Sequence, residues 1–201
     1  MGRQRIVLRS YEESFEPGKV KVISELIDDL DELGDSFTYK LYTSEIQRCL
    51  SAGLLLAAVS VSTSLLELFV RDLSVAQRIL LRHGGDMKLK GRVERELEED
   101  RQAGFHTMLE ALQPTVTTSE DTASLREFYN QTRIPLAHAL VRRLVSPHNQ
   151  VGDEIDDLLG FSHRSLEDRF EDGAIDEVRF VVQIIKKYRP WLLRRYRTAG
   201  G

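Results

Sequence analysis

The sequence predicts an all-α protein, an up-and-down helical bundle with a long central helix. Apolar residues recur at three- and four-residue steps along most of the chain, and strand-like alternation is scarce. The apolar share of 41% is large enough to bury a core, and 201 residues are typical of a single domain. We therefore expect one helical domain over residues 1–201.

The first two helices are predicted from their apolar spacing and their glycines. An N-terminal helix is expected over residues 19–34, where the apolar positions are Val20, Ile23, Leu26, Ile27, Leu30 and Leu33. The rest of the bundle is expected over residues 44–196. It opens with a long helix from about Thr43 or Ser44 to Leu81, which Gly84 and Gly85 close.

The stretch 49–66 contains no charged residue, so a membrane span has to be considered. It carries several hydroxyl side chains, and Arg48 and Glu67 bound it directly. These features favour a buried central helix, and no membrane partner is expected.

Residues 86–102 are densely charged and are expected to form an excursion, either a solvated helix or a projection that binds a partner. A short apolar stripe follows at 105–112, and then a polar linker at 115–124, in which Ser119 or Asp121 could cap the next helix. That helix runs from Leu125, with an interruption at Pro135. A final helix is expected over 174–196, bent at Pro190.

Composition limits the classes of function. The formal net charge is −4, so no overall attraction to nucleic acid is encoded. Cys49 is the single cysteine and the five histidines are scattered, which excludes an intrachain disulfide and gives no zinc pattern. We expect no metal and no cofactor, and a metal site in the acidic cluster 153–157 is disfavoured against a helix start. Because the N-terminus lacks the pattern of a secretory signal, a cytoplasmic location is expected.

The segment 130–143 carries the most informative candidate site. In a continuous helix Arg133 and His138 would diverge, but Pro135 disfavours helical geometry at Ile134 and predicts a break. If Pro135 opens a new helical turn, both side chains can face one space with free backbone amides, which suits a phosphate. The positive end of that helix would keep the imidazole of His138 neutral and able to accept a proton.

Spacing alone discriminates little, because other Arg–His pairs such as Arg78 and His83 have the same separation. The context is more specific. The residues Tyr129, Asn130, Arg133, Pro135, Leu136, Ala137 and His138 resemble the signature of the HEPN family, an arginine followed after four to six residues by a histidine. The segment 65–73 looks like the central helix that precedes this motif, and the resemblance covers roughly residues 44–145.

The resemblance implies a helical homodimer in which two motifs meet in one cleft. In many members this cleft is a metal-independent endoribonuclease linked to toxin, antiviral or stress systems. Arg133 and His138 would then be the catalytic pair. RNA would be the substrate, and an antitoxin or effector protein a partner.

Neighbouring residues are weaker candidates. Arg142 lies four residues beyond His138 and could contact the RNA backbone, although a solvated cation is the simpler interpretation. Asn130 could orient substrate or Arg133, or could serve in a turn. Glu67 interrupts an apolar run where an orienting partner for Arg133 would be useful, and a structural ion pair is the competing interpretation.

Two further features leave functional alternatives open. The run 186–197 interleaves basic and aromatic residues, which is compatible with RNA contacts, an anionic membrane surface or a structural helix end. Many active HEPN members have a polar residue directly after the arginine, whereas this chain has Ile134. This departure favours the alternative function, a non-catalytic HEPN-like dimerisation and partner-binding module that uses residues 86–102 as its contact. The sequence does not identify the RNA target, the activator or the oligomeric state.

Overall fold

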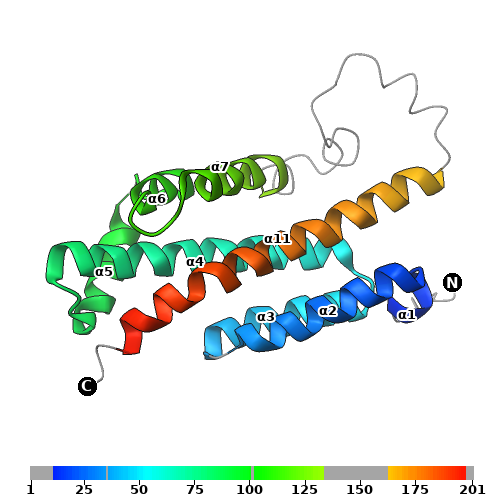
Figure 1. Cartoon of the computed structure of the whole chain (residues 1–201), viewed down its shortest axis with the longest axis horizontal. Coiled ribbons are helices and arrows are strands. Elements are labelled where there is room, and N and C mark those ends of the chain that lie inside the picture. The colour runs from blue at the N-terminus through cyan, green and yellow to red at the C-terminus, as the bar shows by residue number, and fades with distance from the viewer. Residues whose placement is uncertain (1–10, 35, 101, 134–162, 198–201) are drawn as a thin grey trace, which may run out of the picture. The chain divides into compact units, whose positions relative to one another are not determined.

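The structure, a computed structural model, describes residues 11–34, 36–100, 102–133 and 163–197, and every regular element in these ranges is a helix (Figure 1). The prediction of an all-α helical bundle is therefore confirmed. The chain divides into two compact units, one drawn from residues 1–62 and 144–182 and the other from residues 63–143 and 183–201. The boundaries fall within two long helices, α4 (Leu55–His83) and α11 (His163–Arg197).

The first unit contains α1 (Tyr11–Ser14), α2 (Pro17–Leu33), α3 (Phe37–Ser51) and the first parts of α4 and α11. Helices α2 and α3 lie side by side (Figure 1). The amide of Gln47 in α3 donates to the carbonyl of Ile27 at 2.9 Å and to the carboxylate of Asp31 at 2.7 Å. Lys19 pairs with Glu171 at 3.0 Å, so α2 is also tied to α11.

The N-terminal helix matches its prediction, because α2 ends at Leu33 and Gly34 follows as its cap. The single long helix expected from residue 44 to residue 81 is wrong. The chain breaks at residues 52–54, where Gly53 has a φ of 68° and the amide of Leu54 donates to the carbonyl of Cys49 at 2.8 Å. Gly53 adopts this left-handed conformation without a Cβ penalty, so α3 and α4 are separate helices.

The uncharged stretch 49–66 is divided by this break. The hydroxyl of Ser62 donates to the carbonyl of Ala58 at 2.7 Å, which is how a buried hydroxyl is accommodated within an apolar helix. Among the helices of the described residues, none is both long enough and apolar enough to span a bilayer.

The second unit contains the rest of α4 and α11, together with five short elements. These are the 3₁₀-helix η1 (Met87–Leu89), the α-helices α5 (Lys90–Glu99), α6 (Phe105–Leu112) and α7 (Ser119–Phe128), and the π-helix η2 (Tyr129–Arg133). Gly84 and Gly85 have φ angles of 58° and 90°, and they end α4 as predicted.

The charged segment 86–102 differs from the expected excursion. Helix α5 buries Val93 and Leu97 against Val75 and Ile79 of α4, so one of its faces belongs to the core of the second unit. The charges lie on the remaining faces, where Arg92 pairs with Glu96 and Lys90 with Glu94 along the helix. Val93 and Leu97 lie four residues apart and anchor this helix, but among so many charged residues their spacing is not recognisable as an apolar stripe.

Two helix ends also differ from their predictions. The N-cap of α7 is Thr118, whose hydroxyl accepts from the amide of Asp121 at 3.1 Å, and neither Ser119 nor Asp121 has this role. Helix α11 begins at His163, before the expected residue 174, and it continues through Pro190 to Arg197. The break expected at Pro135 and the acidic cluster 153–157 lie outside the described residues.

Candidate functional site

The second unit places Arg133 in a group of polar and aromatic side chains, here called the Arg133 cluster: Glu67, Phe105, His106, Tyr129 and Arg133. The Nε of Arg133 donates to Oε1 of Glu67 at 2.9 Å. The side chains of Arg133 and Glu67 are 34% and 33% exposed, so the pair lies between core and solvent. The ion pair therefore joins α4 to η2 while leaving part of the guanidinium accessible.

The local sequence explains how η2 presents Arg133. Regular α-helix ends at Phe128, and residues 129–133 widen into a π-helical turn that buries Thr132. Such turns are rare, and they occur frequently at functional sites. Tyr129 and Arg133 lie four residues apart at the two ends of η2, and Arg133 contacts Glu67.

Tyr129, the first residue of η2, lies within the electrostatic reach of the same carboxylate. Burial raises the pKa of Tyr129, and the carboxylate of Glu67 raises it further, against an opposing effect of Arg133. Tyr129 therefore remains protonated, and a hydrogen-bond donor, at neutral pH. The Glu67 carboxylate accepts a charge-assisted hydrogen bond from Arg133, which compensates this half-buried charge.

Helix α6 supplies the aromatic side of the cluster. Phe105 stacks on Tyr129 with ring centres 4.1 Å apart, and the ring of His106 meets Tyr129 edge-on at 5.3 Å. His106 is half-buried in this position. Its Nδ1 is buried and has no hydrogen-bond partner among the described residues.

Of the other predicted site residues, the structure describes only Asn130. Asn130 is exposed on η2. His138 and Arg142 lie outside the described residues, as does Ile134. The structure thus brings together Arg133 and Glu67, the pair that the sequence suggested. The structure adds Tyr129, Phe105 and His106 to this pair. Among these three residues, only Tyr129 was noticed in the sequence, as part of the HEPN-like signature.

The basic and aromatic run at the end of α11 makes internal contacts. Lys90 lies over the ring of Tyr196 at 4.8 Å, and Arg195 lies over that of Trp191 at 5.2 Å. Tyr188 and Leu192 are buried. These contacts support the structural interpretation of this run for the residues concerned.

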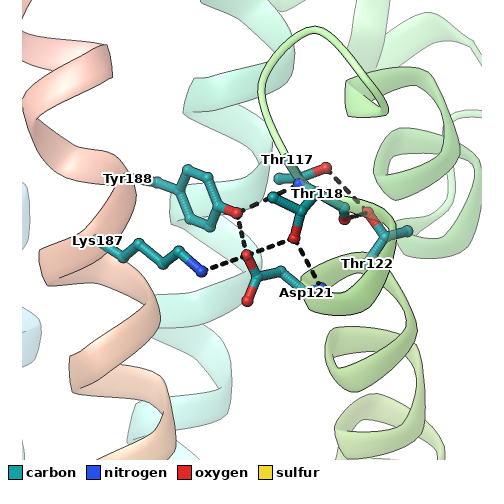
Figure 2. A network of polar contacts seen from close by, with 6 residues as sticks. All are labelled: Thr117, Thr118, Asp121, Thr122, Lys187 and Tyr188. Carbon is teal, nitrogen blue, oxygen red and sulfur yellow. Dashed lines mark hydrogen bonds and ion pairs between the residues drawn. The ribbon is translucent and has the colours of Figure 1, made fainter.

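A polar network at the start of α7, the Asp121 network, consists of Thr117, Thr118, Asp121, Thr122, Lys187 and Tyr188. Figure 2 shows the carboxylate of Asp121 at its centre, where Lys187 at 2.6 Å, Tyr188 and Thr118 at 2.8 Å all donate to the same oxygen. Burial alone would raise the pKa of Asp121, but the hydrogen bonds from Lys187, Tyr188 and Thr118 outweigh it and hold the pKa below its usual value. This network fixes α7 to the second half of α11.

Replacement of Asp121 by asparagine is expected to destabilise the fold by about 1.5 to 3 kcal/mol at neutral pH, because it weakens hydrogen bonds to a charged acceptor. The lowered pKa makes this contribution fully present above the unfolded-state pKa of about 3.8 and removes it as the pH falls through the folded-state value. Urea denaturation of the wild type should therefore show a loss of stability toward acid pH that is smaller in the variant.

Asp176→Asn is the matched control, because Asp176 forms an exposed pair with Arg179 on one helix and is 67% exposed. It should change stability by less than about 0.5 kcal/mol. Equal effects of the two substitutions would contradict a specific role for the Asp121 network.

Three comparisons, with protein-family models, with curated proteins and with solved structures, found no match for this chain. Among the described residues, no group of three or more histidine, cysteine, aspartate or glutamate side chains could hold a metal ion.

Proposed function

We propose that the protein is a HEPN-like, metal-independent endoribonuclease, in which Arg133 and His138 form the catalytic pair. The observation that carries the proposal is the setting of Arg133: a side chain that is one-third exposed, held by Glu67, on a π-helical turn directly before the Pro135 segment.

Anchoring by Glu67 supports this role through the shape of the guanidinium. Arginine has five N–H donors in a planar fork, and the contact with Glu67 uses Nε. A guanidinium fixed at Nε is pre-organised to offer its terminal N–H groups to a phosphoryl oxygen, and a smaller loss of side-chain freedom then accompanies binding.

The proposed reaction is cleavage of RNA by its own 2′-hydroxyl. His138 accepts the proton of that hydroxyl, and the resulting oxygen attacks the adjacent phosphorus. Arg133 stabilises the negative charge that develops on the phosphoryl oxygens. The bond to the 5′-oxygen breaks, and that oxygen takes a proton from the His138 of a second subunit in a homodimer, which must begin the step as the protonated imidazolium. A 2′,3′-cyclic phosphate remains, and the two histidines have exchanged protonation states.

The proposal includes a biological setting. A nuclease of this kind acts on RNA in the cytoplasm and belongs to a toxin, antiviral or stress system, with an antitoxin or effector protein as its partner. The alternative is a non-catalytic dimerisation and partner-binding module. The internal pairing of charges along α5 gives that alternative little support at its expected contact, since these charges already have partners.

The test is an incubation of the purified protein with a labelled single-stranded RNA of mixed sequence in the presence of EDTA. Fragments ending in 2′,3′-cyclic phosphate, identified by mass spectrometry, are expected. Cleavage that appears only after addition of a divalent metal would contradict the mechanism. No cleavage under any condition, with a dimer retained, would favour the partner-binding alternative.

A further inference from the structure

An aromatic ring and a cation are neighbours on η2. Tyr129 and Arg133 are four residues apart, a spacing at which side chains lie next to one another on a helix surface, and both are only half-buried. We infer that Tyr129 is a stacking platform for an unpaired base of single-stranded RNA, whose phosphate is bound by Arg133. The inference deepens the proposed nuclease function, and it rests on that function for RNA as the ligand.

The ring contacts of Tyr129 leave one of its faces uncovered by its aromatic neighbours. Phe105 lies nearly parallel to Tyr129, at 11° and with ring centres 4.1 Å apart, so it covers one face. The ring centre of His106 is 5.3 Å from that of Tyr129 and 6.2 Å from that of Phe105, which makes the angle at Tyr129 close to a right angle. His106 therefore lies at the ring edge, and the second face of Tyr129 has no ring contact among the described residues.

The support behind the ring is suited to stacking. Phe105 is 7% exposed at the start of α6, so it holds the first face of Tyr129 from the core side. Tyr129 itself is only half-buried, so solvent reaches part of the remaining surface of the side chain. A ring that is already fixed by its neighbours loses little rotational freedom when a base stacks on it, and this favours binding.

The two neighbouring groups match two parts of a nucleotide. An unpaired base presents a π face, which stacks on tyrosine whatever the identity of the base. The phosphate is an anion, and the contact of Glu67 at Nε leaves the terminal N–H groups of Arg133 to bind it. A simple anion would use the guanidinium alone and an apolar ligand the ring alone, whereas a nucleotide uses both. The bases of a duplex are already stacked and paired, so a single strand is the form that fits.

The experiment uses the full chain and a single-stranded 2′-O-methyl oligouridylate that carries one 2-aminopurine. The blocked 2′-oxygen prevents cleavage, and the fluorescence of 2-aminopurine is quenched when the base stacks. Titration with the wild type in EDTA is expected to quench the probe. Tyr129→Phe keeps the ring and should quench as fully, whereas Tyr129→Leu should abolish the quenching and raise the Kd at least about fivefold.

Tyr42→Leu is the matched control, because Tyr42 is also half-buried but lies on α3 in the first unit. It should leave the quenching and the Kd unchanged. A second measurement needs no variant and holds even if Tyr129→Leu does not fold. An oligouridylate that contains 5-iodouridine is irradiated with the wild type, and the cross-linked base is expected on Tyr129, within the tryptic peptide 127–133.

A wild type that does not quench the probe, equal quenching by Tyr129→Leu, or a cross-link confined to other peptides would overturn the platform. Quenching that depends on Tyr129, in a protein that cuts no RNA, would refute the nuclease function and support the platform.

If RNA is cut, KM should rise in Tyr129→Leu by about the same factor as the Kd, while kcat changes less than about twofold, because the ring holds the base equally before and during the reaction. An unchanged KM would count against the platform while the nuclease function stands. The two proposals can thus fail separately.

Discussion

Replacing either Arg133 or His138 with alanine is expected to lower metal-independent RNA cleavage by at least about 100-fold. Removal of one stabilising donor from a developing oxyanion costs about 100- to 1,000-fold, and removal of a general acid or base costs about 100- to 10,000-fold. The measurement is a single-turnover cleavage assay in EDTA on the RNA used above.

Arg126→Ala is the matched control for this experiment. Arg126 lies on α7, one helical segment before η2, and pairs with the exposed Glu110 at 2.8 Å. It removes the same positive charge at a position outside the Arg133 cluster, so cleavage should be retained. Activity that survives in Arg133→Ala, or that is lost equally in Arg126→Ala, would count against a specific catalytic role for Arg133.

A large loss of stability is expected for Ile79→Ala in the core of the second unit. Ile79 is fully buried among Val75, Val93 and Leu97. Truncation to alanine leaves a cavity between α4 and α5 and should cost about 2 to 5 kcal/mol, measured by urea denaturation. Leu81→Ala on the same helix is the control, because Leu81 is 65% exposed and its loss should cost less than about 0.5 kcal/mol.

A double-mutant cycle with Leu97→Ala tests the placement of α5. Ile79 and Leu97 belong to one buried cluster, so their effects should couple by about 0.5 kcal/mol or more. Strictly additive effects of the two substitutions would indicate that α5 does not pack on α4 in solution. Residues 86–102 would then again be candidates for a projecting contact with a partner.

The helical class and several helix ends could be predicted because they depend on local physics. The apolar spacing before Gly34 defines α2, and the paired glycines at 84 and 85 end α4. The turn at Gly53 was missed because it lies within a long uncharged stretch whose residues are mostly apolar. A single glycine in such a run can be tolerated in a helix or can end it, and periodicity does not distinguish the two.

The candidate site could be predicted only in part, since its contacts join distant parts of the chain. Glu67 attracted notice as a lone charge in an apolar stretch, and Arg133 as the start of a motif. Their contact at 2.9 Å required the fold. His106 gave no signal at all, because a histidine beside an apolar residue at a helix start is common and its contact with the ring of Tyr129 depends on the fold.

The π-helical turn has a consequence for how this segment can change length. A wider turn accommodates residues that a regular helix would distribute over more than one turn. Because the wide turn absorbs one extra residue, deleting one amino acid between Tyr129 and Arg133 would let the backbone relax to ordinary helix while Arg133 keeps nearly its direction toward Glu67. An inserted residue that the turn does not absorb would instead rotate Arg133 by about 100° about the axis, away from Glu67, although no residue type at the site had been altered. An insertion in residues 129–133 is therefore expected to be more damaging than a single deletion there.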